Sequence, residues 1–201
     1  MTGLVILLHG VGSNGNDLAG LGRHWAPILP GVSFASPDAP FHFEHGAGYQ
    51  WFSLAGITPS NRPARVAEAR EAFDRELTAI LEQHQMTDKL DQVVLVGFSQ
   101  GSIMALDALV SGRWPVAGIV AFSGRLASPQ PLTPALNTPV LLIHGMADGV
   151  IPVAESEAAA ETLRDLGVST RSDFEPGTGH TISARGAQLA AEFIAGRLNL
   201  S

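Results

Sequence analysis

Three side chains that lie far apart in the chain are of the types that together carry out acyl transfer: Ser99, Asp148 and His180. A serine hydroxyl becomes a strong nucleophile when a neighbouring imidazole takes its proton, and a carboxylate can hold that imidazole in the required orientation. Ser99 is the centre of the pattern G-x-S-x-G, which reads GFSQG at 97–101. The pattern is short, and an ordinary turn serine is the alternative, so the surrounding sequence has to decide between the two.

The segment around Ser99 has the context that a nucleophile on a strand-to-helix turn requires. The apolar run 93–96 predicts a strand buried on both faces, and the apolar residues between 103 and 109 predict a helix after it. A glycine stands on either side of the turn, where a Cβ atom would collide with the strand or the helix. We therefore expect the hydroxyl to be held clear of the sheet, with the N–H of Gln100 facing the same space.

Asp148 and His180 each follow another run of strand length, at 140–143 and 170–174. Aspartate next to glycine is commonly only a turn or capping residue. His180 lies between a glycine-rich segment and the last predicted helix, where its ring would be exposed. The three polar residues thus follow separate strands in the order serine, aspartate, histidine, which is the chain order of α/β-hydrolases. We interpret them together as a catalytic triad.

The elements that must position these residues alternate along the chain. Apolar runs of strand length occur at 4–8, 32–35, 93–96, 116–122, 140–143 and 170–174. Helical patterns occur at 17–29, 63–84, 100–111, 154–166 and 183–198. This alternation predicts one three-layer α/β domain over residues 1–201 without a cap domain, in which helices cover both faces of a mainly parallel sheet of about six strands. Ligands of such sheets bind at the carboxyl ends of the strands.

The glycine-rich segment after the first strand has two interpretations. It contains the pattern G-x-G-x-x-G at Gly10, Gly12 and Gly15. This pattern matches the fingerprint of dinucleotide-binding proteins, with Asp38 in the place of the ribose-binding acid. Alternatively, the segment is an open loop whose Val11 N–H forms an oxyanion hole with the N–H of Gln100. We favour the oxyanion hole, because residues 13–16 are poor helix formers where the fingerprint needs a helix.

The connection 36–61 is long and rich in aromatic residues. Long loops in compact domains are often functional. We expect Trp51 and Phe52 both to anchor this loop and to line an apolar substrate pocket beside Ser99. Two further pocket candidates lie in later loops: Leu126 in a proline-rich connection, and Ile151 shortly after the predicted triad aspartate.

Four other histidines have interpretations outside the triad. His9 and His144 each precede a glycine at the end of a predicted strand, and we expect both to be hydrogen-bonded structural residues. His42 and His45 flank Glu44, but a metal site needs more convergent ligands. We expect neither a metal nor a cofactor.

Composition and charge exclude several classes of protein. The net charge of −7 and the absence of a basic run argue against a nucleic-acid-binding surface or an anionic membrane surface. The absence of cysteine excludes disulfides, thiolate metal sites and a cysteine nucleophile. The apolar run at 4–8 is too short for a signal peptide or a membrane span. We therefore expect a cytoplasmic protein without stable membrane insertion.

The chain resembles the phospholipase/carboxylesterase branch of the α/β-hydrolases, the family of bacterial carboxylesterases and acyl-protein thioesterases. Five blocks carry the likeness along nearly the whole chain: LLHGVGSNGNDL, P-D-A-P…W-F-S-L, VGFSQGS, HGMADGVIP and GTGH. The resemblance implies the α/β-hydrolase fold. It also implies Ser99 as nucleophile, Asp148 and His180 as its partners, and the N–H groups of Val11 and Gln100 as oxyanion hole.

Two departures from the family pattern stand out. Ser102 occupies a position where the family often has glycine or alanine, and it is small enough to be tolerated there. The chain also begins directly at the strand that ends in His9, so the leading strands of a full hydrolase sheet are absent. We expect one edge of the sheet to be exposed or covered by a partner, which leaves a homodimer open.

These observations predict a serine hydrolase that cleaves small-molecule carboxylic esters through an acyl-enzyme intermediate. Simple esters, lysophospholipids and acyl thioesters all remain open as substrates. Two alternatives remain: a non-catalytic protein of this fold that binds a small ligand, and a dinucleotide-dependent enzyme. Retention of serine, aspartate and histidine counts against the non-catalytic alternative.

Overall fold

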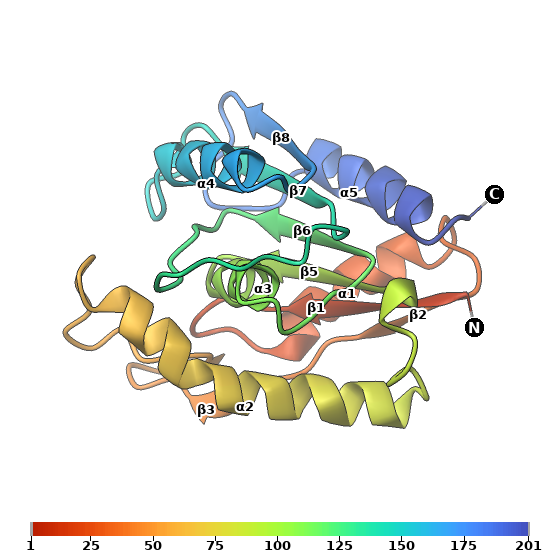
Figure 1. Ribbon diagram of the computed structural model, residues 1–201, viewed down its shortest axis with the longest axis horizontal. Coiled ribbons are helices and arrows are strands. Elements are labelled where there is room, and N and C mark those ends of the chain that lie inside the picture. The colour runs from red at the N-terminus through yellow and green to blue at the C-terminus, as the bar shows by residue number, and fades with distance from the viewer. Residues whose placement is uncertain (1, 201) are drawn as a thin grey trace.

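A six-stranded sheet in which all strands run parallel forms the centre of the molecule (Figure 1). The computed structural model describes residues 2–200. In sheet order the strands are β2 (Val32–Ala35), β1 (Gly3–Leu8), β5 (Val93–Phe98), β6 (Gly118–Phe122), β7 (Val140–Gly145) and β8 (Thr170–Glu175). The predicted α/β architecture with a mainly parallel sheet is confirmed.

The central strands are almost wholly apolar because helices cover both of their faces. In β1, alternate side chains point to opposite sides: Leu4 and Ile6 belong to one buried cluster, and Val5 and Leu7 belong to the other. All four are fully buried. Burial of each such side chain stabilises the fold by roughly 1.5–3 kcal/mol.

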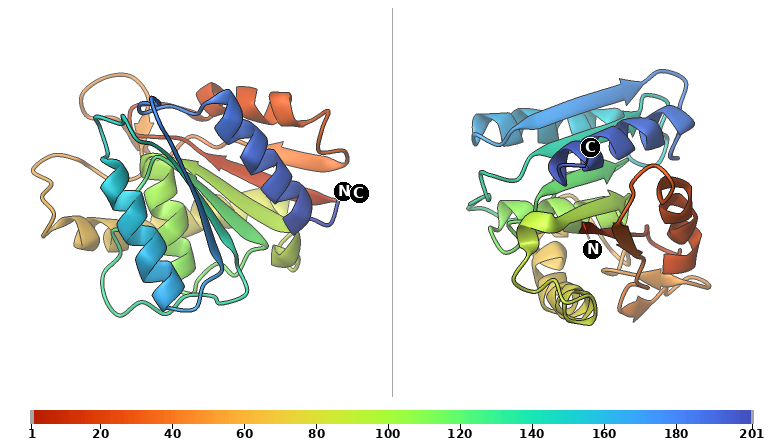
Figure 2. Two further views of the ribbon diagram at one scale, coloured as in Figure 1. Left: turned by 90° about the horizontal axis from the view of Figure 1, so that it is seen from above. Right: turned by 90° about the vertical axis from the view of Figure 1, so that its right-hand side faces the viewer.

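Within residues 2–200, five α-helices flank this sheet (Figure 2). They are α1 (Gly15–Trp25), α2 (Arg62–Gln83), α3 (Gln100–Val110), α4 (Val153–Asp165) and α5 (Ala184–Arg197), with a short 3₁₀ turn at Leu90–Gln92. The helices α1 and α5 cover one face, and α2, α3 and α4 cover the other. The Trp25 indole N–H joins α1 to α5 by donating to the Ala187 carbonyl at 3.0 Å. None of the described helices combines the length and apolar character needed to cross a bilayer.

Helix α1 begins earlier and ends earlier than the pattern at 17–29 predicts. Its start at Gly15 follows from a cap: the Asn14 side chain accepts a hydrogen bond from the Asp17 N–H at 2.9 Å. A Cβ atom at position 15 would run into the Ser36 carbonyl group, so only glycine fits there. The sequence 13–16 thus contains a helix start, although its residues are individually poor helix formers.

The aromatic connection contains a small antiparallel ribbon that the sequence did not indicate. Its strands are β3 (Phe41–His42) and β4 (Tyr49–Gln50). The Tyr49 N–H donates to the Ser13 carbonyl at 2.8 Å, and the Gly12 N–H donates to the Tyr49 carbonyl at 2.8 Å. The ribbon therefore holds the glycine-rich loop that follows β1.

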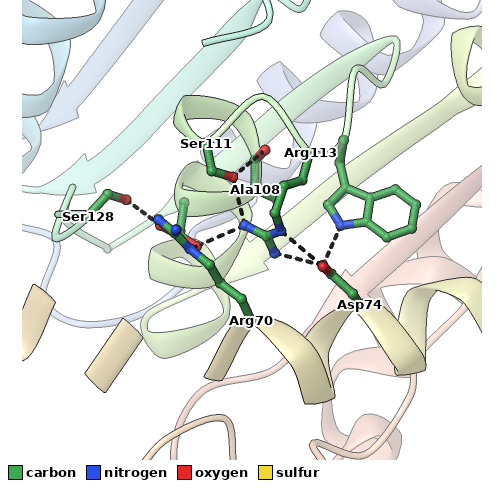
Figure 3. Close-up of polar contacts among 8 residues, drawn as sticks. Arg70, Asp74, Ala108, Ser111, Arg113 and Ser128 are labelled. Atoms are coloured by element: carbon green, nitrogen blue, oxygen red, sulfur yellow. Dashed lines mark hydrogen bonds and ion pairs between the residues drawn. The ribbon is translucent and has the colours of Figure 1, made fainter. Parts of the chain in front are cut away.

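A buried ionic cluster fastens α2 to α3 (Figure 3). Asp107 of α3 is fully buried, and its carboxylate accepts two hydrogen bonds from Arg70 at 2.8 and 2.7 Å. Arg113 reaches the same carboxylate at 3.2 Å and also pairs with Asp74 at 2.7 Å. Ser128 donates the remaining contact at 2.6 Å. A charge this deeply buried is tolerated only with such partners.

The start of β1 and the end of α5 lie at the same end of the molecule (Figure 1). Gly3 begins β1, and a Cβ atom on it would stand only 2.8 Å from the side chain of Leu198, just after α5. This junction lies at the amino ends of the strands, opposite the edge where the predicted site residues follow β5, β7 and β8.

Candidate active site

Ser99 stands in a strained backbone conformation at the junction of β5 and α3. Its φ and ψ angles are 55° and −116°, which non-glycine residues rarely adopt. A Cβ atom at Gly97 would lie 2.5 Å from the Ser102 nitrogen, and one at Gly101 would overlap the Leu8 carbonyl. Both flanking glycines are therefore required by close approach of the backbone, as the sequence pattern predicts.

Ser99, His180 and Asp148 form a continuous chain of hydrogen bonds. His180 Nε2 lies 3.0 Å from Ser99 Oγ, and His180 Nδ1 lies 2.7 Å from Asp148 Oδ2. The other carboxylate oxygen of Asp148 accepts the N–H groups of Val150 and Ile151 at 2.8 and 2.9 Å. The structure thus brings together the three residues that the sequence analysis selected.

The loop that carries His180 is held against the end of β7. A Cβ atom at Gly145 would overlap the carbonyl oxygens of Thr178 and Gly179, so the loop passes directly over this glycine. The Ala147 N–H donates to the Thr178 carbonyl at 2.9 Å. These contacts fix the distance between the imidazole and the turn that contains Asp148.

The Asp148 carboxylate is set up to remain ionised. Burial by itself would raise the pKa of Asp148. The hydrogen bonds from His180 and from the N–H groups of Ile151 and Val150 act in the opposite direction, and together they hold the pKa of Asp148 below its ordinary value of 3.8. A negative carboxylate therefore faces Nδ1 of the imidazole near neutral pH, which keeps the proton on that nitrogen and leaves Nε2 free to accept.

The two other histidines at strand ends are buried and hydrogen-bonded, as expected. His9 Nε2 accepts the Ala39 N–H at 2.8 Å, and its Nδ1 lies 2.7 Å from the Gly10 carbonyl. His144 Nδ1 lies 2.6 Å from Ser156 Oγ, and its Nε2 lies 2.7 Å from the Ile151 carbonyl. Because these partners occupy both ring nitrogens, each ring braces a loop beside the site.

Val11 and Gln100, the two predicted oxyanion-hole residues, border the same cavity as Ser99. Gly10 makes this proximity possible, because even a Cβ atom there would lie 3.3 Å from Ser99 Cβ. The Gln100 side chain makes separate contacts, accepting the Trp51 N–H at 2.7 Å and donating to the Phe52 carbonyl at 2.8 Å. It thereby ties the aromatic connection to the start of α3.

The cavity beside Ser99 has a volume of about 210 Å³ and mainly apolar walls. Its lining consists of Val11, Phe52, Leu54, Ile57, Arg62, Ser99, Gln100, Ile103, Arg125, Val150 and Ile151. Of the four predicted pocket residues, Phe52 and Ile151 line this cavity, whereas Trp51 and Leu126 do not.

Trp51 lies in the core instead, and Leu126 packs against the core. The Trp51 ring packs edge-on against Phe73 of α2, with 5.6 Å between ring centroids, and its indole N–H donates to the His9 carbonyl at 2.8 Å. Leu126 is half-buried against the cluster beneath α2 and α3. The side chain of Trp51 therefore anchors the connection, and Phe52, the next residue, faces the cavity.

Sequence reasoning missed several lining residues, including Ile103, Arg62 and Arg125. The position of Ile103 could have been predicted, because it lies one helical turn after Ser99 on the same face of α3. A weaker indication for Arg125 was its position shortly after the carboxyl end of β6. No sequence feature indicated Arg62, since it reaches the cavity only through the path of the connection before α2.

The fingerprint pattern in the glycine-rich loop does not build a dinucleotide site. The helix does begin within the pattern, at Gly15, although the poor helix formers at 13–16 predicted a later start. However, the Gly15 N–H is occupied by the Asp38 carboxylate at 2.8 Å, and Asn14 caps the next turn. A pyrophosphate at this helix start would meet the negative charges of Asp38 and Asp17 instead of free N–H groups.

Comparison with known proteins places this chain among ester hydrolases. Residues 1–198 match a family model described as Phospholipase/Carboxylesterase. Esterase YpfH of Escherichia coli (strain K12) is 36% identical over 191 residues, which cover 95% of this chain and 81% of that protein. Acyl-protein thioesterase 1 of Neurospora crassa is 27% identical, with 98% of this chain and 87% of that protein covered.

Solved structures agree with this result. The crystal structure of esterase PE8 superposes with a TM-score of 0.88 at 38% identity, covering 97% of this chain and 92% of that one. Arabidopsis thaliana SOBER1 superposes with a TM-score of 0.81 at 24% identity and covers 98% of this chain and 99% of that one, a likeness of fold alone.

Proposed function

Since the chain belongs to the phospholipase/carboxylesterase family and is a hydrolase acting on esters, we propose that Ser99, His180 and Asp148 are its catalytic triad. One observation carries this proposal: the unbroken run of hydrogen bonds from the Ser99 hydroxyl through both nitrogens of His180 to the Asp148 carboxylate. The strained turn that presents Ser99 at the wall of a cavity supports the same assignment.

In the proposed reaction, His180 Nε2 takes the proton of Ser99 as its Oγ attacks the ester carbonyl. The C–O bond of the tetrahedral intermediate then breaks, and the leaving alcohol departs with the proton from Nε2. Water, deprotonated by the same imidazole, hydrolyses the acyl-serine and restores the enzyme. Asp148 stays ionised throughout and stabilises the imidazolium.

The carbonyl oxygen becomes negatively charged in the tetrahedral intermediate and needs hydrogen-bond donors. The Val11 and Gln100 N–H groups are the proposed donors, because both residues border the cavity beside Ser99. Fixed backbone donors of this kind stabilise an oxyanion more than its neutral precursor; loss of one costs roughly 10²–10³ in rate.

The proposed substrates are small carboxylic esters with short or medium acyl groups. The cavity is small and largely apolar, which suits a compact acyl chain. Acyl thioesters are a second candidate, since relatives from several fungi are named acyl-protein thioesterases. The same nucleophile and oxyanion donors serve either acyl donor.

Labelling with a fluorophosphonate followed by peptide mass spectrometry tests the mechanism. We expect a single adduct on Ser99, and Ser99→Ala should abolish labelling and lower turnover of p-nitrophenyl butyrate by about 10⁴-fold or more.

Ser123 provides a matched control for this experiment. It directly follows β6, the neighbour of β5 in the sheet, and has a similar backbone φ of 52°, yet its hydroxyl has no hydrogen-bond partner among the described residues. Ser123→Ala should keep both the adduct and the turnover. An adduct on another residue, or full turnover by Ser99→Ala, would contradict the proposal.

A further inference from the structure

Two arginines line the cavity that contains Ser99. Arg62 is the first residue of α2, and Arg125 lies in the connection after β6. The other lining residues are apolar or uncharged, and none is an aspartate or a glutamate. Two positively charged residues therefore line a cavity of about 210 Å³ whose other walls suit an uncharged acyl chain.

Neither guanidinium is paired with a carboxylate in the described part of the chain. Across residues 2–200, neither takes part in an ion pair or a side-chain hydrogen bond, and the Arg125 Nε atom is buried without a partner. Arg70 and Arg113, which are similarly half-buried, each pair with carboxylates at 2.7 Å. A buried N–H group without an acceptor is costly, so an acceptor supplied from outside would be favoured.

The two charges also act on each other. Burial lowers the pKa of Arg62 from its ordinary value, and the positive charge of Arg125 lowers it further, while Glu155 acts in the opposite direction. Glu155 approaches neither arginine closely enough to form an ion pair. Mutual repulsion of two cations in a partly desolvated space is relieved when an anion binds between them.

We propose that Arg62 and Arg125 form a subsite for an anionic group, so that the preferred substrates are small esters that carry a carboxylate or a phosphate. This inference rests on the proposed function, because it places the anion in the same cavity as the attacking Ser99. Guanidinium groups recognise both carboxylate and phosphate through paired, charge-assisted hydrogen bonds. An enzyme with an overall charge of −7 would otherwise repel such substrates.

Two matched pairs of substrates test the inference and distinguish the source of the anion. One pair is p-nitrophenyl hemiglutarate and the neutral p-nitrophenyl hexanoate, which places a carboxylate on the acyl side. The other is monobutyrylglycerol 3-phosphate and monobutyrylglycerol, which places a phosphate on the alcohol side. We expect kcat/KM to favour the anionic member of at least one pair, and the pair in which it does so identifies the group bound.

Variants then assign the selectivity to the two arginines. Arg62→Gln and Arg125→Gln should each reduce the anionic-to-neutral ratio of kcat/KM by about tenfold, through KM, since a hydrogen bond to a charged group is lost. Arg125→Lys should recover part of the ratio. Arg75→Gln is the matched control: it removes one positive charge from the exposed side of the same helix and should leave the ratio unchanged.

Failure of the inference is distinguishable from failure of the proposed function. If neutral esters are cleaved by a Ser99-dependent reaction but neither pair shows anionic preference, or the ratio is the same in Arg62→Gln, Arg125→Gln and Arg75→Gln, the subsite is refuted and the triad stands. If no ester is cleaved and Ser99 is not labelled, the proposed function itself fails. A thermal unfolding curve for each variant verifies that it is folded.

Discussion

At the scale of single residues, hydrogen-bond partners decide which histidine can act as a base. His9, His144 and His180 all stand next to a glycine at the edge where the strands end. Structural partners occupy the rings of His9 and His144, whereas His180 Nε2 faces a hydroxyl at the wall of a cavity. In His9 the accepting nitrogen is already bonded to a backbone N–H, and in His144 one ring nitrogen faces the Ser156 hydroxyl and the other the Ile151 carbonyl. Neither ring therefore has a free lone pair to offer to a substrate proton.

His9 gives the fold a dependence on pH that does not involve the chemistry. Burial lowers the pKa of His9 below its ordinary value of 6.5, although the Gly10 carbonyl and Asp38 oppose this shift. The unfolded chain therefore binds a proton on His9 at a higher pH than the native state does. The stabilising contribution is complete above pH 6.5 and is lost as the pH falls from there through the lowered pKa.

We expect the melting temperature to fall as the pH is lowered from 6.5 through the depressed pKa of His9, and to fall less in His9→Gln. The glutamine oxygen can still accept the Ala39 N–H, but the side chain does not titrate. Differential scanning calorimetry across this range checks the prediction. Parallel pH profiles for the wild type and His9→Gln would show that another group is responsible.

At the scale of the elements, the ionic cluster between α2 and α3 fixes the positions of the two helices that carry cavity residues. Ser99 and Gln100 stand at the start of α3, and α2 begins with Arg62 at the cavity. The contact of Asp107 with Arg70, and that of Arg113 with both Asp107 and Asp74, hold α3 in a fixed position against α2. The position of Arg62 relative to Ser99 thus depends on contacts made near the carboxyl end of α3.

Loss of the buried carboxylate in Asp107→Ala should destabilise the protein by about 3 kcal/mol, because half-buried Arg70 then loses its carboxylate partner and Arg113 keeps only Asp74. Urea unfolding measures this difference. The exposed pair of Arg185 and Asp173 provides the control, and Asp173→Ala should cost less than about 1 kcal/mol. Equal costs for the two variants would show that the cluster is no more than a surface contact.

Helices and strands with a long continuous or periodic apolar pattern could be predicted from the sequence. Short strands that are stabilised by hydrogen bonds to neighbouring loops could not. The strand β5 and the helix α2 follow directly from continuous and periodic apolar residues. The ribbon of β3 and β4 has two residues per strand, and its hydrogen bonds to the glycine-rich loop are not encoded in any local pattern. The expectation that Trp51 lines the pocket is wrong for the same reason. Trp51 packs in the core and Phe52 lines the cavity, and this choice depends on the path of the connection.

At the scale of the whole molecule, the sheet order assembles the candidate site. The strands β5, β6, β7 and β8 lie side by side and run in the same direction, so the residues that follow them meet at one edge. Ser99 follows β5, Asp148 follows β7 and His180 follows β8. The loop that crosses Gly145 brings the imidazole back over the intervening strands. Chain order and sheet order together therefore make the contact predictable, whereas the cavity depends on loops from both halves of the chain.

The volume of this cavity limits the acyl chain. In a series of p-nitrophenyl esters, each methylene that is buried should raise kcat/KM by about fourfold, the equivalent of about 0.8 kcal/mol. We expect the increase to stop at a medium chain length, because about 210 Å³ is then filled. Ile103→Phe narrows the cavity and should move the optimum to a shorter chain. A steady increase up to dodecanoate would contradict this limit.

Gly3 and Leu198 are in contact at the amino ends of the strands, away from Ser99. A short covalent link between the start of β1 and the end of α5 would reduce the conformational entropy of the unfolded chain while leaving the contacts among Ser99, His180 and Asp148 in place. Circularly permuted versions opened in an exposed loop would then offer new termini, and an appended peptide could be moved around the molecule without disturbing its chemistry.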